Sequence, residues 1–435
     1  MINFPSSPTP LNSFRRLAVV AVALAAGLPV AGALAPSPAA AQAGAIAPRW
    51  FGQNAGAAAQ QLIQLLSTAQ ADGLNPRRYN VRGLTRAVQE AQGGNPGAVQ
   101  RAEAMLNSAL YSYATDVRHD PNVGIIYVDR ALKPVPLAQG ELLRRAADAP
   151  SLSDFVSKMG WMNPIYGQLR SAIASRMYRS EAQRRVLMVN LDRARALPAG
   201  TGRYVIVNPP AARLYMYENG QVVDSMRVVA GRPDAIAQTP MMNAFIRYEA
   251  LNPYWNSPPD ITSRKLAPTI LKEGRAYFRN RGYEVLSDWS DNARVIDPMS
   301  INWRAVAAGQ LKVRMRQKPG PANSMGKMKF MFPNEQGIWL HDTPEKEKIE
   351  DAARLQSNGC VRLEDAARLS RWLFNGHPPT TQGAKPEQKV NLPSPVPLYI
   401  TYLTAVPSGT SIVYFDDFYG KDRATAAPRR MSSLR

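Results

Sequence analysis

The chain of 435 residues contains one cysteine, Cys360, and His341 lies a short distance upstream of it. A free thiol is mostly protonated at neutral pH, but a neighbouring imidazole can take its proton and leave a thiolate–imidazolium pair that attacks a carbonyl carbon. Gly359 precedes the cysteine and Arg362 follows it. Glycine allows close backbone approach to a substrate, and arginine binds carboxylates through a fork of donors. The combination predicts a cysteine acyl-transfer site; the alternative is a cysteine that only fills space in the core.

The residues around this pair indicate how the chain would hold it. The apolar run 338–340 predicts a strand that ends at His341. An amphipathic pattern over 363–374 predicts a helix that begins shortly after Cys360. In that arrangement the backbone N–H groups over 358–361 could face a substrate carbonyl and form an oxyanion hole.

Metal and cofactor chemistry are not predicted. Three widely spaced histidines and one cysteine do not make a plausible zinc site. His119 and His377 lie in polar loop sequences, where a histidine is usually solvated. We therefore expect no metal and no cofactor.

Residues 1–41 have the pattern of a secretory signal peptide. Arg15 and Arg16 precede an almost wholly apolar run over 17–35, and 39–41 offer a small-residue cleavage site. A retained membrane anchor is the alternative, because the run could just span a bilayer. A single cysteine excludes an internal disulfide framework. We expect an exported protein located in the periplasm and associated with the cell wall.

The composition is typical of a globular protein with a substantial core. Hydrophobic residues make up 45% and charged residues 20% of the chain. Cleavage of the leader would leave about 390 residues, enough for two or three domains. The formal net charge of +20 favours binding to a polyanion. Export argues against nucleic acid and favours a cell-envelope polymer, unless the charge only keeps the protein in solution.

The sequence predicts an α+β protein. Helical periodicity over 42–200 indicates a helical scaffold domain. Over 201–420, short β-branched and aromatic runs between turn signals predict a mainly β domain, a sandwich or a partly open barrel. The β pattern lapses over about 257–320, which we interpret as an inserted lid. Residues 421–435 are strongly basic and are expected to form a disordered tail.

Two motifs resemble those of a known family. Leu340-His341-Asp342-Thr343-Pro344 and Ser357-Asn358-Gly359-Cys360-Val361-Arg362-Leu363 are similar to the signature of the L,D-transpeptidases with a YkuD-type catalytic domain. Segments 229–233 and 239–242 resemble the start of that domain. Segment 252–259 resembles the stretch before the lid in the large subgroup that has a lid and an N-terminal scaffold domain.

The chain departs from the family pattern at two places. Trp339 stands two residues before the histidine, where many members of the subgroup have tyrosine, which puts a phenolic contribution to the oxyanion hole in doubt. The stretch 170–189 is too short for the peptidoglycan-binding module that relatives often carry. The basic scaffold and the lid could take over its docking role.

The resemblance implies roles for individual residues. Cys360 would be the nucleophile and His341 the base. The loop and oxyanion residues would be Ser357, Asn358 and Gly359, with N–H groups donated by Gly359 and Cys360. The substrate-binding residues would be Arg362, Trp339 and Trp255. Two structural alternatives stay open: Arg362 could pair with the helix acids Glu364 and Asp365, and Ser357 could be ordinary turn chemistry.

The implied activity is that of an acyltransferase in peptidoglycan metabolism, with a part in cell-wall biogenesis or degradation and in cell shape. The cysteine would attack the bond after the L-centre of diaminopimelate in a stem tetrapeptide and release D-Ala. The thioester would then pass to the side-chain amine of a second, diaminopimelate-bearing stem and give a 3→3 cross-link. The implied partners are therefore peptidoglycan stem peptides, and carbapenems are expected to inhibit by acylating the cysteine.

Other functions remain open. The same acyl-enzyme could attach outer-membrane proteins to peptidoglycan, take up a D-amino acid, or pass to water as in an L,D-carboxypeptidase. Sortases and cell-wall cysteine endopeptidases arrange their cysteine, histidine and arginine in a different order or spacing, which disfavours both. A catalytically idle envelope-binding protein is the alternative from another class, and thiol reactivity would distinguish it from an enzyme.

Overall fold

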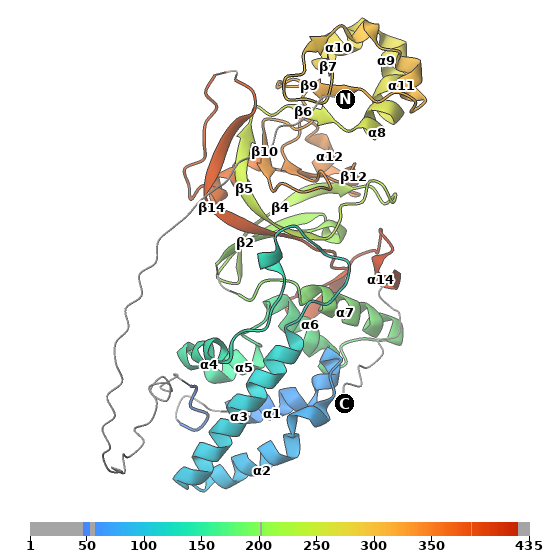
Figure 1. Cartoon of the computed structure of the whole chain (residues 1–435). Helices are drawn as coiled ribbons and strands as arrows, with labels where there is room; N and C mark the ends of the chain where they lie inside the picture. Colours follow the sequence, from blue (N-terminus) through green and yellow to red (C-terminus); the bar gives the residue numbers. More distant parts are fainter. Residues whose placement is uncertain (1–46, 53–56, 201, 384, 425–435) are drawn as a thin grey trace, which may run out of the picture. The chain divides into compact units, whose positions relative to one another are not determined.

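A computed structural model of the chain describes residues 47–52, 57–200, 202–383 and 385–424 (Figure 1). The expected signal peptide over 1–41 lies outside these residues. In the part of the chain that is described, no helix is long and apolar enough to cross a membrane. The described residues form a helical region, a large sheet and a smaller inserted region.

The helical region consists of amphipathic helices that begin at polar caps. The Asn95 side chain accepts a hydrogen bond from the N–H of Ala98, and Pro96 occupies the first helical position, a favourable start for α3. Ser180 caps α7 through the N–H of Gln183. The elements are α1 (Ala58–Ser67), η2 (Ala69–Asp72), η3 (Pro76–Tyr79), α2 (Val81–Gln92), α3 (Pro96–Val117), β1 (Ile126–Tyr127), η4 (Arg130–Leu132), α4 (Gln139–Asp148), α5 (Leu152–Ser157), α6 (Pro164–Ala174) and α7 (Glu181–Ala194).

A buried ionic network fixes these helices to one another. The Asp72 carboxylate accepts hydrogen bonds from the hydroxyls of Tyr113 (2.7 Å) and Tyr166 (2.6 Å) and from Nε of Arg170 (3.2 Å). Its backbone carbonyl accepts a further bond from Arg195. All five residues are buried. A buried charge is tolerated only when it is paired and hydrogen-bonded, so this network holds η2 against α3 and α6.

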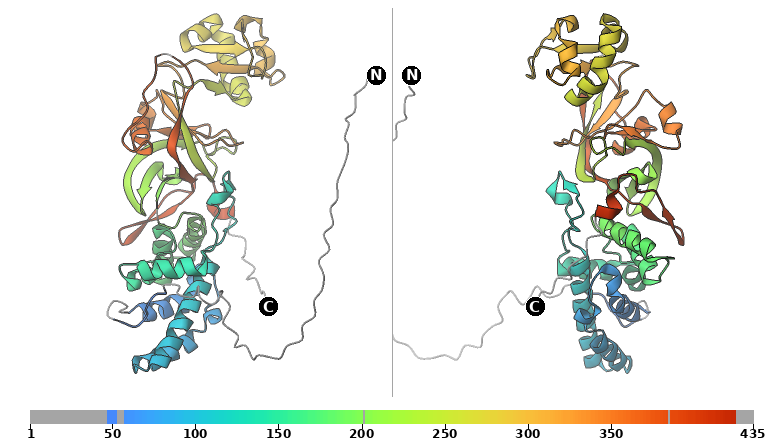
Figure 2. Two further views of the ribbon diagram at one scale, coloured as in Figure 1. Left: turned by 60° about the vertical axis from the view of Figure 1, so that its left-hand side comes forward. Right: turned by 90° about the vertical axis from the view of Figure 1, so that its right-hand side faces the viewer.

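The large sheet closes into a barrel. Its strand order is β1-β5-β10-β11-β13-β4-β3-β2-β14, and β14 pairs again with β5, so the strands from β5 to β14 form a closed ring with β1 beside β5. Figure 2 shows these strands from two further directions. The strands are β2 (Arg203–Asn208), β3 (Arg213–Glu218), β4 (Gln221–Gly231), β5 (Met242–Leu251), β10 (Met328–Met331), β11 (Leu340–His341), β12 (Leu355–Ser357, paired with β4), β13 (Val361–Leu363) and β14 (Gln388–Ile400), and the short η5 (Pro209–Ala211) joins β2 to β3.

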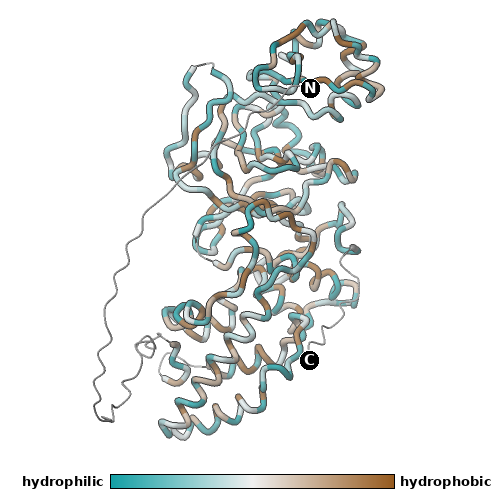
Figure 3. Tube along the Cα trace, in the orientation of Figure 1, coloured by the Kyte–Doolittle hydropathy of each residue, from teal (hydrophilic) through white to brown (hydrophobic). Residues whose placement is uncertain are grey.

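Side chains that alternate along the barrel strands pack into two different hydrophobic cores. Val205 and Val207 of β2 point into the barrel interior, whereas Tyr204 and Ile206 face the core of the helical region. Figure 3 shows the hydrophobic stretches along these strands and helices. Helix α13 (Ala366–Leu373) contributes its expected stripe of Ala366, Leu369 and Leu373 to the barrel core. The expected α+β architecture, with a helical N-terminal region and a barrel-like sheet domain, is confirmed.

The insertion has its own sheet and core. Its strands follow the order β6-β9-β7-β8, and its core includes Tyr277, Val285 and Met315. The β pattern of the sequence lapses here, yet four short strands form beside the helices. The strands are only two to four residues long, and in β9 the buried Met315 alternates with arginines, so the hydrophobic signal is weak. The elements are β6 (Trp255–Ser257), α8 (Pro259–Ile261), η6 (Thr262–Leu266), α9 (Ala267–Glu273), α10 (Arg275–Arg281), β7 (Tyr283–Leu286), β8 (Val295–Ile296), η7 (Pro298–Ser300), α11 (Trp303–Ala307) and β9 (Arg314–Gln317).

Two local predictions next to the cysteine differ from the structure, one in the length of a strand and one in the element that follows Cys360. The strand predicted from the apolar run 338–340 ends at His341 as expected, but it is shortened to β11, because the Asn334 side chain bonds both the N–H and the carbonyl of Ile338. The chain after Cys360 forms strand β13, and α13 begins only at Ala366, after the N-cap Asp365. The cysteine therefore precedes a barrel strand and not a helix.

The prediction of a disordered tail over 421–435 is wrong for its first four residues. Lys421–Ala424 form the short helix α14, which follows the hairpin β15 (Ala405–Ser408) and β16 (Ser411–Tyr414). Asp422 of α14 pairs with the buried Arg193 of α7 at 2.6 Å and accepts a hydrogen bond from the Thr404 hydroxyl at 2.7 Å. Pairing with a buried guanidinium explains why this segment is ordered. Residues 425–435 lie outside the described range.

Candidate active site

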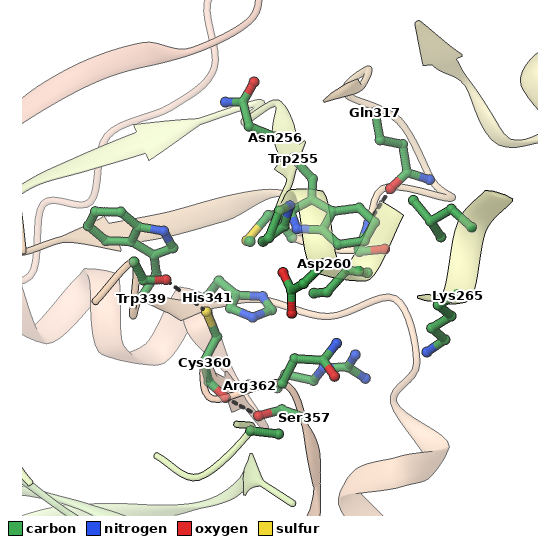
Figure 4. A pocket seen from close by; sticks show the side chains of 18 of the residues that line it. Trp255, Asn256, Asp260, Lys265, Gln317, Trp339, His341, Ser357, Cys360 and Arg362 are labelled. Atoms are coloured by element: carbon green, nitrogen blue, oxygen red, sulfur yellow. Dashed lines mark hydrogen bonds between the residues drawn. The ribbon is translucent and has the colours of Figure 1, made fainter. Parts of the chain in front are cut away.

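A cavity of about 960 Å³ is lined by residues of both the barrel and the insertion (Figure 4). Seven of the eight candidate site residues line it, and Gly359 lies in the loop between two of them. The seven are Trp255, Trp339, His341, Ser357, Asn358, Cys360 and Arg362. The structure thus brings together residues that are separated by more than a hundred positions in the chain.

Parallel pairing of two short strands places the histidine beside the cysteine. In the β11–β13 ladder Leu340 is opposite Val361, and His341 is opposite Arg362. Cys360 comes directly before β13, and the Val361 N–H donates to the Trp339 carbonyl at 2.9 Å. The side chains of His341 and Cys360 enter the same cavity from adjacent strands (Figure 4).

A backbone carbonyl sets the tautomer of His341. Its Nδ1 lies 2.5 Å from the Asp342 carbonyl oxygen, which can only accept a hydrogen bond. Nδ1 must therefore carry the proton, and Nε2 of the neutral ring is left with a lone pair. This tautomer is assigned from the bonding partner. It gives the ring an acceptor that can serve as a general base.

Burial moves the titration of both groups away from neutral pH. It lowers the pKa of His341 to about 4, and the charge of Arg362 acts in the same direction. Burial also raises the pKa of the Cys360 thiol to about 11. A backbone hydrogen bond with Trp339 and the charge of Arg362 act in the opposite direction but are weaker. Both shifts favour the neutral forms, so the resting pair is a thiol and an imidazole. The thiolate–imidazolium pair expected from the sequence is not favoured in this conformation.

Ser357 organises the loop that presents the cysteine. Its buried hydroxyl donates to the Cys360 carbonyl at 2.5 Å and accepts from the Gly359 N–H at 3.1 Å. Gly359 has φ of +112°, and a Cβ there would lie 2.9 Å from Ile338 Cδ1. Only glycine adopts this backbone without strain. Both residues therefore shape the turn, and the proposed loop role of Ser357 has a geometric basis.

This bonding corrects the expected oxyanion hole. The Gly359 N–H is already bonded to Ser357, so it is not available to a substrate oxygen in this conformation. The Cys360 N–H has no hydrogen-bond partner among the described residues and remains a candidate donor. Of the two N–H groups predicted to form the oxyanion hole, the one of Gly359 instead stabilises the turn of the loop.

The comparisons with known proteins agree with this geometry. Residues 202–383 match the family model of the L,D-transpeptidase catalytic domain, YkuD, and residues 42–173 match that of a scaffold domain. The chain carries an L,D-transpeptidase catalytic domain of the YkuD family. A Haemophilus influenzae protein provisionally named an L,D-transpeptidase is 27% identical over 378 residues, which cover 84% of this chain and 74% of that protein. The family predicted from the motifs is confirmed.

Arg362 of the L,D-transpeptidase domain is paired with a residue that the sequence analysis did not consider. Its guanidinium bonds Glu345, which also accepts from Lys348 at 2.6 Å. Neither of the expected partners is used. Glu364 pairs with Arg227 of β4 at 2.8 Å, and Asp365 caps α13. A substrate carboxylate at Arg362 would therefore compete with Glu345.

Two further residues, Thr239 and Arg232, support the loop that contains Cys360 and were not predicted from the sequence. The buried Thr239 donates from Oγ1 to the Gly359 carbonyl and accepts from the Gly231 N–H, both at 2.8 Å. Arg232 donates from its backbone to the Ser357 carbonyl at 3.0 Å and from its guanidinium to Asn358 Oδ1 at 2.6 Å. Both lie in segments that resemble the family, but neither residue type by itself signals a loop support. Asn358 is thus held by Arg232.

The two candidate tryptophans come from opposite walls. Trp339 lies beside β11 and contacts Phe332, with ring centroids 5.9 Å apart. Trp255 belongs to β6 of the insertion and contacts Tyr283 edge to face at 6.0 Å. Figure 4 shows both rings at the cavity on either side of His341. The L,D-transpeptidase domain therefore offers apolar surfaces to a ligand from the barrel and from the insertion.

Proposed function

We propose that this protein is an exported cysteine L,D-transpeptidase that forms 3→3 cross-links in peptidoglycan. It would cleave D-Ala from a stem tetrapeptide through a thioester on Cys360. One observation carries the proposal: the thiol and His341 enter a single cavity from neighbouring strands, with Nδ1 held by a carbonyl and Nε2 left as an acceptor. The YkuD match supports the same reaction class.

Acylation would start from the neutral pair. Sγ of Cys360 attacks the carbonyl carbon after the L-centre of diaminopimelate while its proton moves to Nε2 of His341. The Cys360 N–H would donate to the oxyanion. When the C–N bond breaks, the D-Ala nitrogen takes the proton from His341 and leaves as the amine. The acyl group is then held as a thioester.

Transfer to the acceptor would reverse the proton movements. The side-chain amine of a second stem attacks the thioester carbonyl and gives a proton to His341. The C–S bond breaks as the amide forms, and the proton returns to Sγ. Since each half-reaction uses a neutral base and a neutral thiol, the directions of the two pKa shifts suit both of them.

Export is part of the proposal because peptidoglycan, on which the family acts, is an envelope polymer. The supporting feature is the leader pattern over 1–41. Together they favour a periplasmic, wall-associated location.

Product analysis tests the proposed reaction. Purified protein is incubated with disaccharide-tetrapeptide, and products are identified by mass spectrometry. The expected product is a 3→3 dimer with one D-Ala released per link. In a matched reaction, donor whose diaminopimelate amine is acetylated should give no dimer. Dimer formation from the acetylated donor, or no consumption of either donor, would overturn the proposal.

A further inference from the structure

More basic than acidic side chains line the cavity. The six basic ones are Arg232, Arg264, Lys265, Arg281, Lys348 and Arg362, and the four acidic ones are Asp234, Asp260, Glu335 and Glu345. Glu345 is shared by Arg362 and Lys348, so one carboxylate serves two positive groups. Asp234 is bonded by Arg232 at 2.9 Å and is also occupied. All five side chains line the cavity. At Glu345, therefore, two cations of the barrel wall share a single carboxylate.

Lys265 adds a further cation from the insertion. It lines the same cavity and forms no ion pair with a described residue. Desolvation lowers the pKa of Lys265, and the charges of Lys348 and Arg362 lower it further, with Glu345 acting in the opposite direction. Figure 4 shows Arg362 between Cys360 and Lys265.

The backbone at this lysine is unusual. Lys265 lies in η6 (Thr262–Leu266), a π-helical turn between α8 and α9. Single π-turns inside helices are rare and are frequent at functional sites, where they redirect a side chain. Thr262 is buried and bonds Ser257 Oγ at 2.8 Å, which anchors the turn next to β6. The turn therefore presents Lys265 to the cavity from a fixed base.

We infer that Lys265 binds a carboxylate of the donor stem, and that Lys265, Arg362 and Lys348 form an anion subsite shared by the insertion and the barrel. This inference rests on the proposed function. An anion there would add a second negative group beside Glu345, the carboxylate that Arg362 and Lys348 share, and a charge-assisted hydrogen bond forms where an ammonium meets a carboxylate.

The position of the subsite selects one carboxylate. A tetrapeptide donor carries one on the terminal D-Ala, directly beside the bond that Cys360 would attack. It carries another at the end of the diaminopimelate side chain, several bonds away, and a third on the γ-linked glutamate, one residue further from the bond. Because Arg362 lies between Cys360 and Lys265, the ligand of Lys265 must reach past it (Figure 4). This favours the diaminopimelate carboxylate.

Binding measurements in a non-acylating background test the inference. The full chain with Cys360→Ala is titrated with disaccharide-tetrapeptide by calorimetry, alone and combined with Lys265→Met, Lys265→Arg or Lys272→Met. Lys272 is an exposed lysine of the same insertion outside the cavity lining and serves as the matched control. Lys265→Met is expected to weaken binding by about 10-fold, Lys265→Arg by much less, and Lys272→Met not at all.

Amidated donors identify the carboxylate. With the diaminopimelate carboxylate amidated, Lys265→Met should make no difference; with the D-Ala carboxylate amidated, the 10-fold effect should persist. The reverse pattern, an equal loss with every donor, no loss, or no binding of the unmodified donor would overturn the inference. Release of D-Ala is followed separately with unmodified Cys360. Its absence alongside normal binding would overturn the proposed function and not the anion subsite.

Discussion

Because the pKa of His341 is lowered, we predict that the enzyme stays active to a much lower pH than an enzyme whose general base is an ordinary histidine. Burial first, and Arg362 second, lower its pKa from 6.5 to about 4. A general base acts only when it is unprotonated, so activity should persist above pH 4 and be lost as the pH falls through about 4. An unperturbed histidine would lose its function near pH 6.5.

The size of the effect follows from the two pKa values. At pH 5 an imidazole with a pKa of about 4 is about 90% neutral, whereas one with a pKa of 6.5 is about 3% neutral. The expected rates at pH 5 therefore differ by about 30-fold. The gap between the two values corresponds to about 3.4 kcal/mol. The same gap lowers fold stability as the pH falls from 6.5 to about 4, because the unfolded chain binds the proton more readily.

The assay follows acylation of Cys360 by a carbapenem, read by intact-mass spectrometry from pH 3.5 to 8. Circular dichroism at each pH separates loss of the base from loss of the fold. A thiolate–imidazolium pair could lose activity over a similar range of acidic pH. To distinguish the two, the ultraviolet absorbance of the thiolate is measured as the difference between the unmodified protein and Cys360→Ala. A thiol with a pKa of about 11 is about 0.1% ionised at pH 8, against about 24% for an ordinary thiol.

Two results would refute this reasoning. An acidic limb near pH 6.5 would mean that His341 is as basic as a solvated histidine. A thiolate signal at neutral pH would mean that the resting pair is charged and that burial does not control the site. The expected result is a limb near pH 4 with no thiolate until the pH approaches 11.

The remaining predictions concern the loop, the helical core and the insertion. Gly359→Ala should slow carbapenem acylation of Cys360 by roughly 10- to 100-fold, because the added Cβ strains a backbone with φ of +112° by about 1–3 kcal/mol; unchanged acylation would show that the loop adapts. Asp72→Ala should lower the free energy of unfolding in urea by about 3–5 kcal/mol, since it leaves buried partners unpaired. The exposed Asp148→Ala should change it little, and similar values for the two variants would contradict the network. Replacing 258–314 by a short Gly/Ser bridge that joins β6 to its partner β9 should impair turnover of stem peptides much more than iodoacetamide labelling of the thiol; equal losses would make the insertion structural.

Features encoded by local periodicity were predicted well from the sequence. The buried stripe of α13 follows the helical period, and the β-branched run over 204–207 forms β2. The pairing of His341 with Cys360 was predicted from residue types and motif resemblance. The parallel β11–β13 ladder that brings them together depends on long-range pairing, which the spacing of two residues does not encode.

Features decided by tertiary partners were missed. From the sequence, Glu364 and Asp365 were the possible ion-pair partners of Arg362. In the structure Glu364 pairs with Arg227 on another strand, and Arg362 pairs with Glu345. The Gly359 N–H was assigned to an oxyanion, but Ser357 captures it within the turn. In both cases a nearer or better-placed partner competes for the same group, and only the folded chain shows which partner that is.

Direct detection of the acyl-enzyme tests the central claim most closely. Purified protein is mixed with disaccharide-tetrapeptide, quenched in acid and examined by intact-mass spectrometry and peptide mapping. The account predicts an adduct equal to the donor minus D-Ala, located on Cys360, with neither adduct nor released D-Ala in a folded Cys360→Ala variant. Continued release of D-Ala by Cys360→Ala would contradict the account.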